Sequence, residues 1–369
     1  MRMHLEGNIV LRDRVVSGRV GFDSHIREIM PLPAVVERYI LPGFIDGHVH
    51  GGGGADTMDG VAAIETLSRF HLRHGTTTIL PTTITAPWSD VMNALRAVAE
   101  VCDRGLRDGP RIYGAHLEGP FVSPHKLGAQ PPFTLEPTAD HVTEAIGTGC
   151  VRVVTIAPEL DHAPAAMKAF AQAGVRVSLG HTTTDHAGAE RAICLVCAAG
   201  GTVGATHLFN AMSPIEGRRP GPVTALMCSD VAYGEMIFDT HHVHPASFRL
   251  AERVMGHRLL FVTDAMRGTG QPDGPSQLGG QDVLIRDGVV RLPDGTLAGS
   301  VLTLDQALRN AIDAGMSLPK AARLVSTNAA TYLGLHDRGM IAPDLLADFT
   351  VLDDRFRVIE VWVNGKRRV

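Results

Sequence analysis

The sequence predicts an α/β protein: a (β/α)8 TIM barrel with a small β-sandwich domain built from both chain ends. Three observations support this fold class. Short apolar runs alternate with helical patterns through the middle of the chain, which is typical of parallel βα units. Eight such runs occur, the number that closes a barrel. The chain ends show only strand and turn patterns, and neither end is long enough to form a core alone.

The elements follow in a regular order. Residues 11–29 have the pattern of short strands separated by turns. Eight apolar runs come next, and each ends in polar residues: 40–46, 76–83, 111–118, 151–158, 175–181, 202–207, 235–239 and 259–264. Helical periodicity fills most of the intervals, at 61–74, 90–104, 163–173, 185–199 and 245–255.

The strand pattern returns near the C-terminus, at 348–353 and 358–365. The simplest arrangement pairs these strands with those of the N-terminus. We therefore expect one small β domain from residues 1–42 and 337–369, beside a catalytic barrel over residues 43–336. The alternative is an open doubly wound sheet. Such a sheet favours a glycine-rich phosphate loop after its first strand, and Gly51–Gly54 lacks the GxGxxG spacing.

Composition narrows the class of protein. The 369 residues are 44% hydrophobic and 20% charged, which is ordinary for a globular enzyme. The formal net charge of −5 provides no electrostatic footprint for nucleic acid or an anionic membrane. Residues 1–6 lack the apolar core of a signal peptide, and no apolar stretch is long enough to span a bilayer. We expect a cytoplasmic protein.

The cysteines carry no strong signal. There are five, an odd number that does not suggest a disulfide framework. Cys194 and Cys197 have CxxC spacing, but a single pair with apolar neighbours is a weak zinc or redox motif. We expect these two to be buried cysteines on a helix.

His48 and His50 follow the first apolar run, and four glycines follow them. Residues two apart in a strand point to the same side, so the two imidazoles converge. Such a pair suits a borderline divalent metal, and Gly51–Gly54 are expected to leave the space above it free of side chains. For an arbitrary HxH, two partly exposed histidines in a turn are the alternative. The remaining ligands decide between the two.

Other strand ends supply such ligands. Glu118 ends the third run, His181 the fifth, His207 the sixth and Asp264 the eighth. Each one alone is more often structural, as a helix cap or a satisfied core residue. In a barrel, however, the carboxyl ends of all strands meet at one mouth. Four histidines and two carboxylates at one mouth indicate a metal site.

These motifs resemble the amidohydrolase superfamily, and most closely its N-acetylglucosamine-6-phosphate deacetylase family. The resemblance rests on HxH, HLEGPF around Glu118, GHT around His181 and ATHLFNAM around His207, and it extends over essentially the full length. It implies hydrolysis of N-acetylglucosamine 6-phosphate to glucosamine 6-phosphate and acetate, in amino-sugar catabolism and cell-wall recycling. Residues 151–158 contain no lysine, which argues against dihydroorotase-like or hydantoinase-like relatives that use a carboxylated lysine.

The resemblance also implies the ligands. Glu118, His181 and His207 bind one metal, and His48 and His50 make a second site that shares Glu118. We expect one or two divalent ions per chain, with zinc the first choice and iron, manganese or cobalt as alternatives. Asp264 is the expected general base, which then protonates the leaving amine as a general acid.

Substrate contacts follow from the same resemblance. Arg218 is expected to reach the phosphate in the active site of a neighbouring subunit, which implies a homodimer. Gln130 stands where some members have a histidine that donates to the acetyl carbonyl; glutamine can donate but cannot be cationic. The other expected contacts are Ala129, Asn210, Ala211, His242, Leu297, Ala298 and Gly299.

Three alternatives stay open. The substrate can be the 4-epimer, N-acetylgalactosamine 6-phosphate, or another N-acyl compound. A non-catalytic scaffold is the rival from a different class. Scaffolds of this kind lose metal ligands or the acid–base residue, and this chain keeps them.

Overall fold

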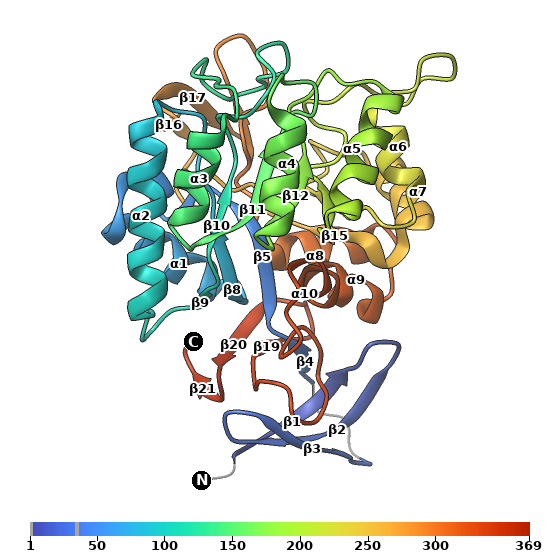
Figure 1. Cartoon of the computed structure of the whole chain (residues 1–369). Coiled ribbons are helices and arrows are strands. Elements are labelled where there is room, and N and C mark those ends of the chain that lie inside the picture. Colours follow the sequence, from blue (N-terminus) through green and yellow to red (C-terminus); the bar gives the residue numbers. More distant parts are fainter. Residues whose placement is uncertain (1–2, 34–36) are drawn as a thin grey trace.

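The computed structural model describes residues 3–33 and 37–369. Figure 1 shows a barrel surrounded by helices, with a separate sheet at the end of the barrel where β5 begins. The strands that form the barrel are β5 (Phe44–Val49), β8 (Thr76–Pro81), β9 (Arg111–Ile112), β10 (Ala115–Leu117), β11 (Val151–Ile156), β12 (Arg176–Leu179), β13 (Val203–Ala205), β14 (Gly234–Met236) and β15 (Leu259–Phe261).

The parallel strands close into a ring. The pairs β5–β8, β8–β9, β10–β11, β11–β12, β12–β13 and β14–β15 are all parallel. Main-chain hydrogen bonds of Tyr233 to Val203 and Ala205 connect β13 with the start of β14. The bond from Asp264 N–H to the His48 carbonyl closes β15 onto β5 at 2.9 Å. Since β9 and β10 are two parts of the third strand, the predicted eight-stranded barrel is confirmed.

The five predicted helices are all present within two residues of their expected ends. The structure adds helices that the sequence pattern did not reveal, such as α6, which has only seven residues and begins with proline. The helices are α1 (Val61–Arg73), α2 (Trp88–Arg104), α3 (Ala139–Gly147), α4 (Ala163–Gln172), α5 (His186–Ala198), α6 (Pro222–Cys228), α7 (Pro245–Met255), α8 (Leu304–Asp313), α9 (Leu318–Val325) and α10 (Thr327–Leu333), with short 3-10 turns η1 (Thr57–Asp59) and η2 (Gly256–Arg258).

Both chain ends contribute to one seven-stranded sheet, in the order β21-β20-β19-β4-β1-β2-β3. Phe22 of β2 lies 5.1 Å from the ring of Phe349 and 5.3 Å from that of Trp362, although their strands are not neighbours. The sheet therefore folds over its own apolar core, as the predicted β-sandwich requires. Its strands are β1 (Met3–Val10), β2 (Val15–Phe22), β3 (Ile26–Pro31), β4 (Tyr39–Pro42), β19 (Phe349–Leu352), β20 (Val358–Val363) and β21 (Lys366–Arg367).

Two predictions about the first apolar run and the glycines that follow it were wrong. Gly43 divides it, so that residues 39–42 pair in the terminal sheet and only the part from Phe44 onward enters the barrel. The glycines after His50 do not open space above the histidines. They form a tight hairpin, β6 (Gly51–Gly52) and β7 (Ala55–Asp56), where a Cβ on Gly51 would meet the Arg267 main chain at 2.6 Å.

An antiparallel insertion after β15 was not predicted. It consists of β16 (Gly274–Leu278), β17 (Gln281–Arg286) and β18 (Val289–Arg291), and it has a small apolar core of its own. Cys194 and Cys197 do lie on helix α5, but both are exposed, so their predicted burial was wrong. Among the described residues, no helix is both long and apolar enough to cross a membrane.

Candidate metal and catalytic site

The six predicted ligands and acid–base groups meet at the mouth of the barrel. Each lies at or just after the end of a barrel strand, and each is buried to at least nine-tenths of its surface. Three of them have a left-handed backbone, at φ 47° for His181, 32° for His207 and 49° for Asp264. This conformation is uncommon for residues other than glycine and concentrates at functional sites. It turns these side chains into the mouth as the chain leaves the strand.

Glu118 lies at the centre of the cluster. Its Oε1 atom is 3.1 Å from Nε2 of His207 and 3.2 Å from Nε2 of His181. The same oxygen is 3.6 Å from Nε2 of His48, and Oε2 is 3.2 Å from Nε2 of His50. One carboxylate thus faces two histidine pairs, which is the geometry of a bridging ligand.

The pair of His181 and His207 fits a cation. The Nδ1–H of His181 donates to the Lys126 carbonyl at 2.9 Å, so Nε2 of the neutral ring carries a lone pair. That nitrogen lies 3.0 Å from Nε2 of His207, and both face Glu118. Two imidazole nitrogens and a carboxylate oxygen at this spacing suit a borderline divalent metal.

The pair of His48 and His50 fits a cation in the same way. The Nδ1–H of His48 donates to Oε2 of Glu235 at 3.1 Å, which leaves the Nε2 lone pair 3.3 Å from Nε2 of His50. Each pair forms, with Glu118, a buried triad whose ligand atoms lie within 4.8 Å of one another. The residues present can therefore hold two metals that share Glu118.

The electrostatics of the site favour positive charge between the carboxylates. Burial lowers the pKa of His50, but hydrogen bonds to Asp264 and Glu118 outweigh this and raise it to about 9. Burial likewise opposes charge on His48, yet Glu118 and Asp264 raise its pKa well above the usual value. Burial raises the pKa of Glu118, while the nearby histidines hold it well below the usual range. A divalent ion supplies the charge that this arrangement stabilises.

Asp264 faces the same centre. Its Oδ1 atom lies 3.1 Å from Nε2 of His50 and 3.5 Å from Nε2 of His48. Burial raises the pKa of Asp264, but the two histidines outweigh burial and lower it to about 2. Asp264 is therefore a carboxylate near neutral pH, the state that can accept a proton.

Sequence reasoning missed Glu235 as a site residue. Glu235 lies within β14 and is buried; one carboxylate oxygen accepts from His48, and the other, Oε1, has no hydrogen-bond partner among the described residues and lies 4.0 Å from Nδ1 of His116. A carboxylate behind a ligating histidine fixes the ring tautomer and orientation. The available signal was an acidic residue inside an otherwise apolar barrel strand.

Gln130 contacts Glu118 directly, a contact that the sequence did not predict. Its amide N–H donates to Oε2 of Glu118 at 2.6 Å, and its carbonyl accepts from Thr85 N–H at 2.7 Å. Both ends of the side chain are thus engaged. In this geometry Gln130 orients the shared carboxylate.

A cavity of about 220 Å³ opens above the cluster. The side chain of His242 is held there by a 2.7 Å hydrogen bond from its Nδ1 to Asp239. Of the predicted substrate contacts, those that line the cavity are Ala129, Gln130, Asn210, Ala211, His242, Leu297 and Gly299.

Two predicted substrate residues lie outside this lining. Ala298 is fully buried in the core of the β16–β18 insertion. Its neighbours Leu297 and Gly299 line the cavity instead. Arg218 is exposed and lies on the 213–220 loop between the β13 end and α6. The structure therefore does not bring it to the cavity of its own chain.

Comparisons with known proteins agree with this geometry. The Amidohydrolase family model matches residues 39–368. An N-acetylgalactosamine-6-phosphate deacetylase from Escherichia coli O157:H7 is 36% identical, with 93% of this chain and 92% of the relative covered. An N-acetylglucosamine-6-phosphate deacetylase from Bacillus subtilis is also 36% identical, with 89% and 84% covered.

Solved structures give the same result. A mutant N-acetyl-D-glucosamine-6-phosphate deacetylase from Mycobacterium smegmatis, in complex with N-acetyl-D-glucosamine-6-phosphate, superposes with a TM-score of 0.91. It is 32% identical, and the match covers 100% of this chain and 99% of that one. The deacetylase from Thermotoga maritima gives 0.90 at 28% identity, with 100% and 99% covered. From its family match, its relatives and its barrel-mouth site together, the chain belongs to the amidohydrolase family.

Proposed function

We propose that this protein is a metal-dependent deacetylase that hydrolyses N-acetylglucosamine 6-phosphate to glucosamine 6-phosphate and acetate. The observation that carries the proposal is Glu118 between two histidine pairs, with the Asp264 carboxylate 3.1 Å from Nε2 of His50. Relatives that carry this activity in their names match almost the whole chain. The reaction belongs to amino-sugar catabolism and cell-wall recycling.

The metal ligands in this proposal are Glu118, His181 and His207 for one ion, and His48, His50 and Glu118 for a second. Divalent metals in such sites lower the pKa of water and polarise carbonyl groups. Zinc is the ion we expect first, because imidazole and carboxylate ligands suit it; iron, manganese and cobalt accept the same ligands.

Asp264 performs the proton transfers. Its carboxylate takes a proton from the attacking water and returns it to the nitrogen of the substrate amide. An amine leaves poorly unless it is protonated, so the second transfer completes the cleavage. Gln130 holds Glu118 in place through its amide N–H.

The phosphosugar occupies the cavity above the metals. Asn210, Ala211 and His242 hold the sugar phosphate on one side of the cavity, while Ala129, Leu297 and Gly299 contact the substrate from the others. Ala298 supports this wall from the core side. The segment of Leu297, Ala298 and Gly299 closes over the bound sugar.

Arg218 is the remaining phosphate ligand, and it comes from a second subunit of a homodimer. Its exposure, outside the cavity of its own chain, supports this assignment. Subunit mixing tests it: Arg218→Ala and Asp264→Asn chains are each expected to be nearly inactive. A dimer of one of each has one site with both residues intact, so mixing should restore activity. No recovery in verified mixed dimers would contradict the assignment.

A second candidate substrate is N-acetylgalactosamine 6-phosphate, because a relative of that activity is 36% identical over 92% of its length. Acetate release from both phosphorylated epimers and from unphosphorylated N-acetylglucosamine tests the assignment. We expect the glucosamine epimer to have the highest kcat/KM. Faster turnover of the galactosamine epimer would reverse the order, and equal rates without phosphate would contradict a phosphosugar substrate.

Two further expectations belong to the same proposal. The catalytic barrel comprises residues 43–336, and the small β domain comprises residues 1–42 and 337–369. The shared sheet of β1–β4 and β19–β21 supports this division. We also propose that the protein acts in the cytoplasm, where phosphorylated sugars are metabolised.

A further inference from the structure

A second, larger cavity lies at the opposite end of the barrel from the metal site. It has a volume of about 800 Å³ and is enclosed by the start of β9, the 104–110 segment after α2, residues 148–152 and the terminal sheet. Figure 1 places β9 close to β20 and the C-terminus at this end. The cavity is therefore at the seam between the barrel and the terminal sheet.

The wall of this cavity has an excess of positive charge. Five arginines line it against two aspartates, although the chain as a whole has a formal net charge of −5. A concave site with one sign of charge concentrates ions of the opposite sign. The five arginines are Arg104, Arg111, Arg152, Arg338 and Arg368.

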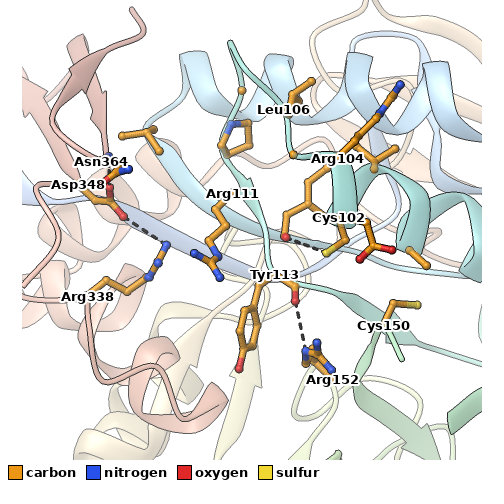
Figure 2. Close-up of a pocket in the computed structure, with 18 of the residues that line it drawn as sticks. Cys102, Arg104, Leu106, Arg111, Tyr113, Cys150, Arg152, Arg338, Asp348 and Asn364 are labelled. Atoms are coloured by element: carbon orange, nitrogen blue, oxygen red, sulfur yellow. Dashed lines mark hydrogen bonds and ion pairs between the residues drawn. The ribbon is translucent and has the colours of Figure 1, made fainter. Parts of the chain in front are cut away.

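Two of the arginines are already neutralised by carboxylates. The Arg338 guanidinium bonds both oxygens of Asp337 at 2.9 and 3.0 Å, and it lies 3.3 Å from Asp348. Arg104 pairs with Glu65, and in Figure 2 it points away from Arg111 and Tyr113. The positive charges of Arg338 and Arg104 are therefore balanced by ion pairs within the protein.

The other three form no close ion pair with a carboxylate among the described residues, although the charge of Arg111 acts on Asp337 and Asp348 at longer range, and that of Arg368 acts on Asp108. Arg152 donates to the carbonyls of Tyr113 and Gly149 and stacks over the Tyr113 ring at 5.3 Å. Arg111 makes no hydrogen bond or ion pair in the described part of the chain, and Figure 2 shows its guanidinium between Arg338 and Tyr113. The Nε–H of Arg368 is buried without a partner.

These contacts leave donors unused. A buried N–H without an acceptor destabilises the fold; this applies to the Nε–H of Arg368, whereas the exposed Arg111 offers its donors to the open side of the cavity. Guanidinium groups bind oxyanions through two parallel hydrogen bonds, and phosphate is a preferred partner. Arg111 belongs to the barrel and Arg368 to the end of the chain beside the terminal sheet, so one anion between them would join the two parts.

We propose that this cavity binds a small phosphate-bearing metabolite, which holds the terminal sheet against the barrel through Arg111 and Arg368. The volume lies within the range of metabolite sites, and Tyr113 provides a flat face for the rest of the ligand. The site is separate from the barrel mouth and does not rest on the proposed deacetylase activity.

Calorimetric titration with inorganic phosphate tests the proposal. The proteins are the wild type, the Arg111→Gln/Arg368→Gln double variant and an Arg253→Gln control, whose exposed arginine lies on α7 away from this cavity. The wild type and the control should bind one more phosphate per chain than the double variant, or bind it about tenfold more tightly or better. Phosphate at the barrel mouth is common to all three, and circular dichroism checks that each folds.

Crystals of the wild type soaked in tungstate, a heavy phosphate analogue, locate the site without any substitution. An anomalous peak within hydrogen-bond distance of Arg111 and Arg368 supports the proposal. Identical phosphate isotherms for all three proteins, or tungstate peaks confined to the barrel mouth, would overturn it. Tighter binding of citrate than of phosphate by the same cavity would overturn the assignment to phosphate.

Discussion

The two histidine pairs of the metal centre are built differently, although both face Glu118. His181 and His207 come from two separate strands, and a main-chain carbonyl, that of Lys126, fixes the His181 ring. His48 and His50 are two residues apart in one segment, and a side chain, Glu235, fixes the His48 ring. The His181 ring therefore depends on a main-chain carbonyl of the loop after β10, and the His48 ring on one carboxylate that a substitution can remove.

The position of Asp264 adds to this difference. Its carboxylate lies beside the pair of His48 and His50. A cation at that pair would therefore be adjacent to the acid–base group, while a cation at His181 and His207 would be held by side chains of which one is oriented by a main-chain carbonyl. We infer that the first pair secures the resident metal and the second adjusts its reactivity. Substitutions that affect one pair, both pairs or neither separate these roles.

Removal of Glu118 should have the largest effect, because both pairs use it. We expect Glu118→Gln to lose both metals and to lose more turnover than the roughly 10²–10⁴-fold ascribed to an acid–base residue. Metal analysis and acetate release on the same preparation measure this. Retention of a full metal equivalent by this variant would contradict a shared ligand.

Asp264→Asn should leave both pairs intact and stop the proton transfers. We expect metal content to remain at the wild-type level while kcat falls by about 10²–10⁴-fold. The measurement is kcat divided by the metal bound per chain, which separates a loss of proton transfer from a loss of metal. Near-normal turnover would remove Asp264 from the mechanism.

Glu235→Gln should affect only the second pair. Loss of the carboxylate behind a ligating histidine weakens metal binding by about 10–100-fold, so we expect one metal to dissociate more easily and the other to be unchanged. Chelator titration of the metals measures this, with Glu190→Gln as a control because Glu190 is exposed on α5. Equal weakening of both metals would show that Glu235 acts on the fold as a whole.

His71 gives the smallest expected effect, on stability. Burial lowers the pKa of His71 to about 4, although its Nε2–H donates to the Gly51 carbonyl beside His50. The folded protein binds this proton less readily than the unfolded chain, whose pKa is near 6.5. The contribution of neutral His71 is therefore complete above pH 6.5 and is lost as the pH falls toward 4, by about 3 kcal/mol in total.

His71→Gln keeps an N–H donor but cannot be protonated in this range. We expect its unfolding free energy in urea, measured on metal-free protein, to fall less steeply between about pH 6.5 and pH 4 than that of the wild type. Metal-free samples exclude the loss of ligands to protons. If the unfolding free energies of the two proteins fell in parallel with pH, the lowered pKa of His71 would be contradicted.

The predictable site residues are those whose side-chain direction is determined by the path of the main chain alone. Glu118, His181, His207 and Asp264 follow strand ends, and a closed parallel barrel brings all strand ends to one mouth. His48 and His50 converge because strand side chains repeat every two residues. Each of these placements follows from periodicity and needs no knowledge of packing.

The parts that were missed depend on contacts between distant segments. Glu235 reaches His48 across 187 residues, and Gln130 turns to Glu118 because the Thr85 main chain holds its other end. The space beside Gly51 is filled by the main chain of Arg267, which follows the neighbouring strand β15 but lies more than 200 residues away in the sequence. No local pattern encodes such pairings, so tertiary packing decided them.

We infer that Glu118 joins two metal sites of different construction. Metal content per chain, measured by plasma mass spectrometry on the wild type and on His48→Ala/His50→Ala, tests it most directly. We expect two equivalents in the wild type and one in the double variant, with the remaining equivalent removed by His181→Ala. One equivalent in the wild type, unchanged by loss of His48 and His50, would contradict it.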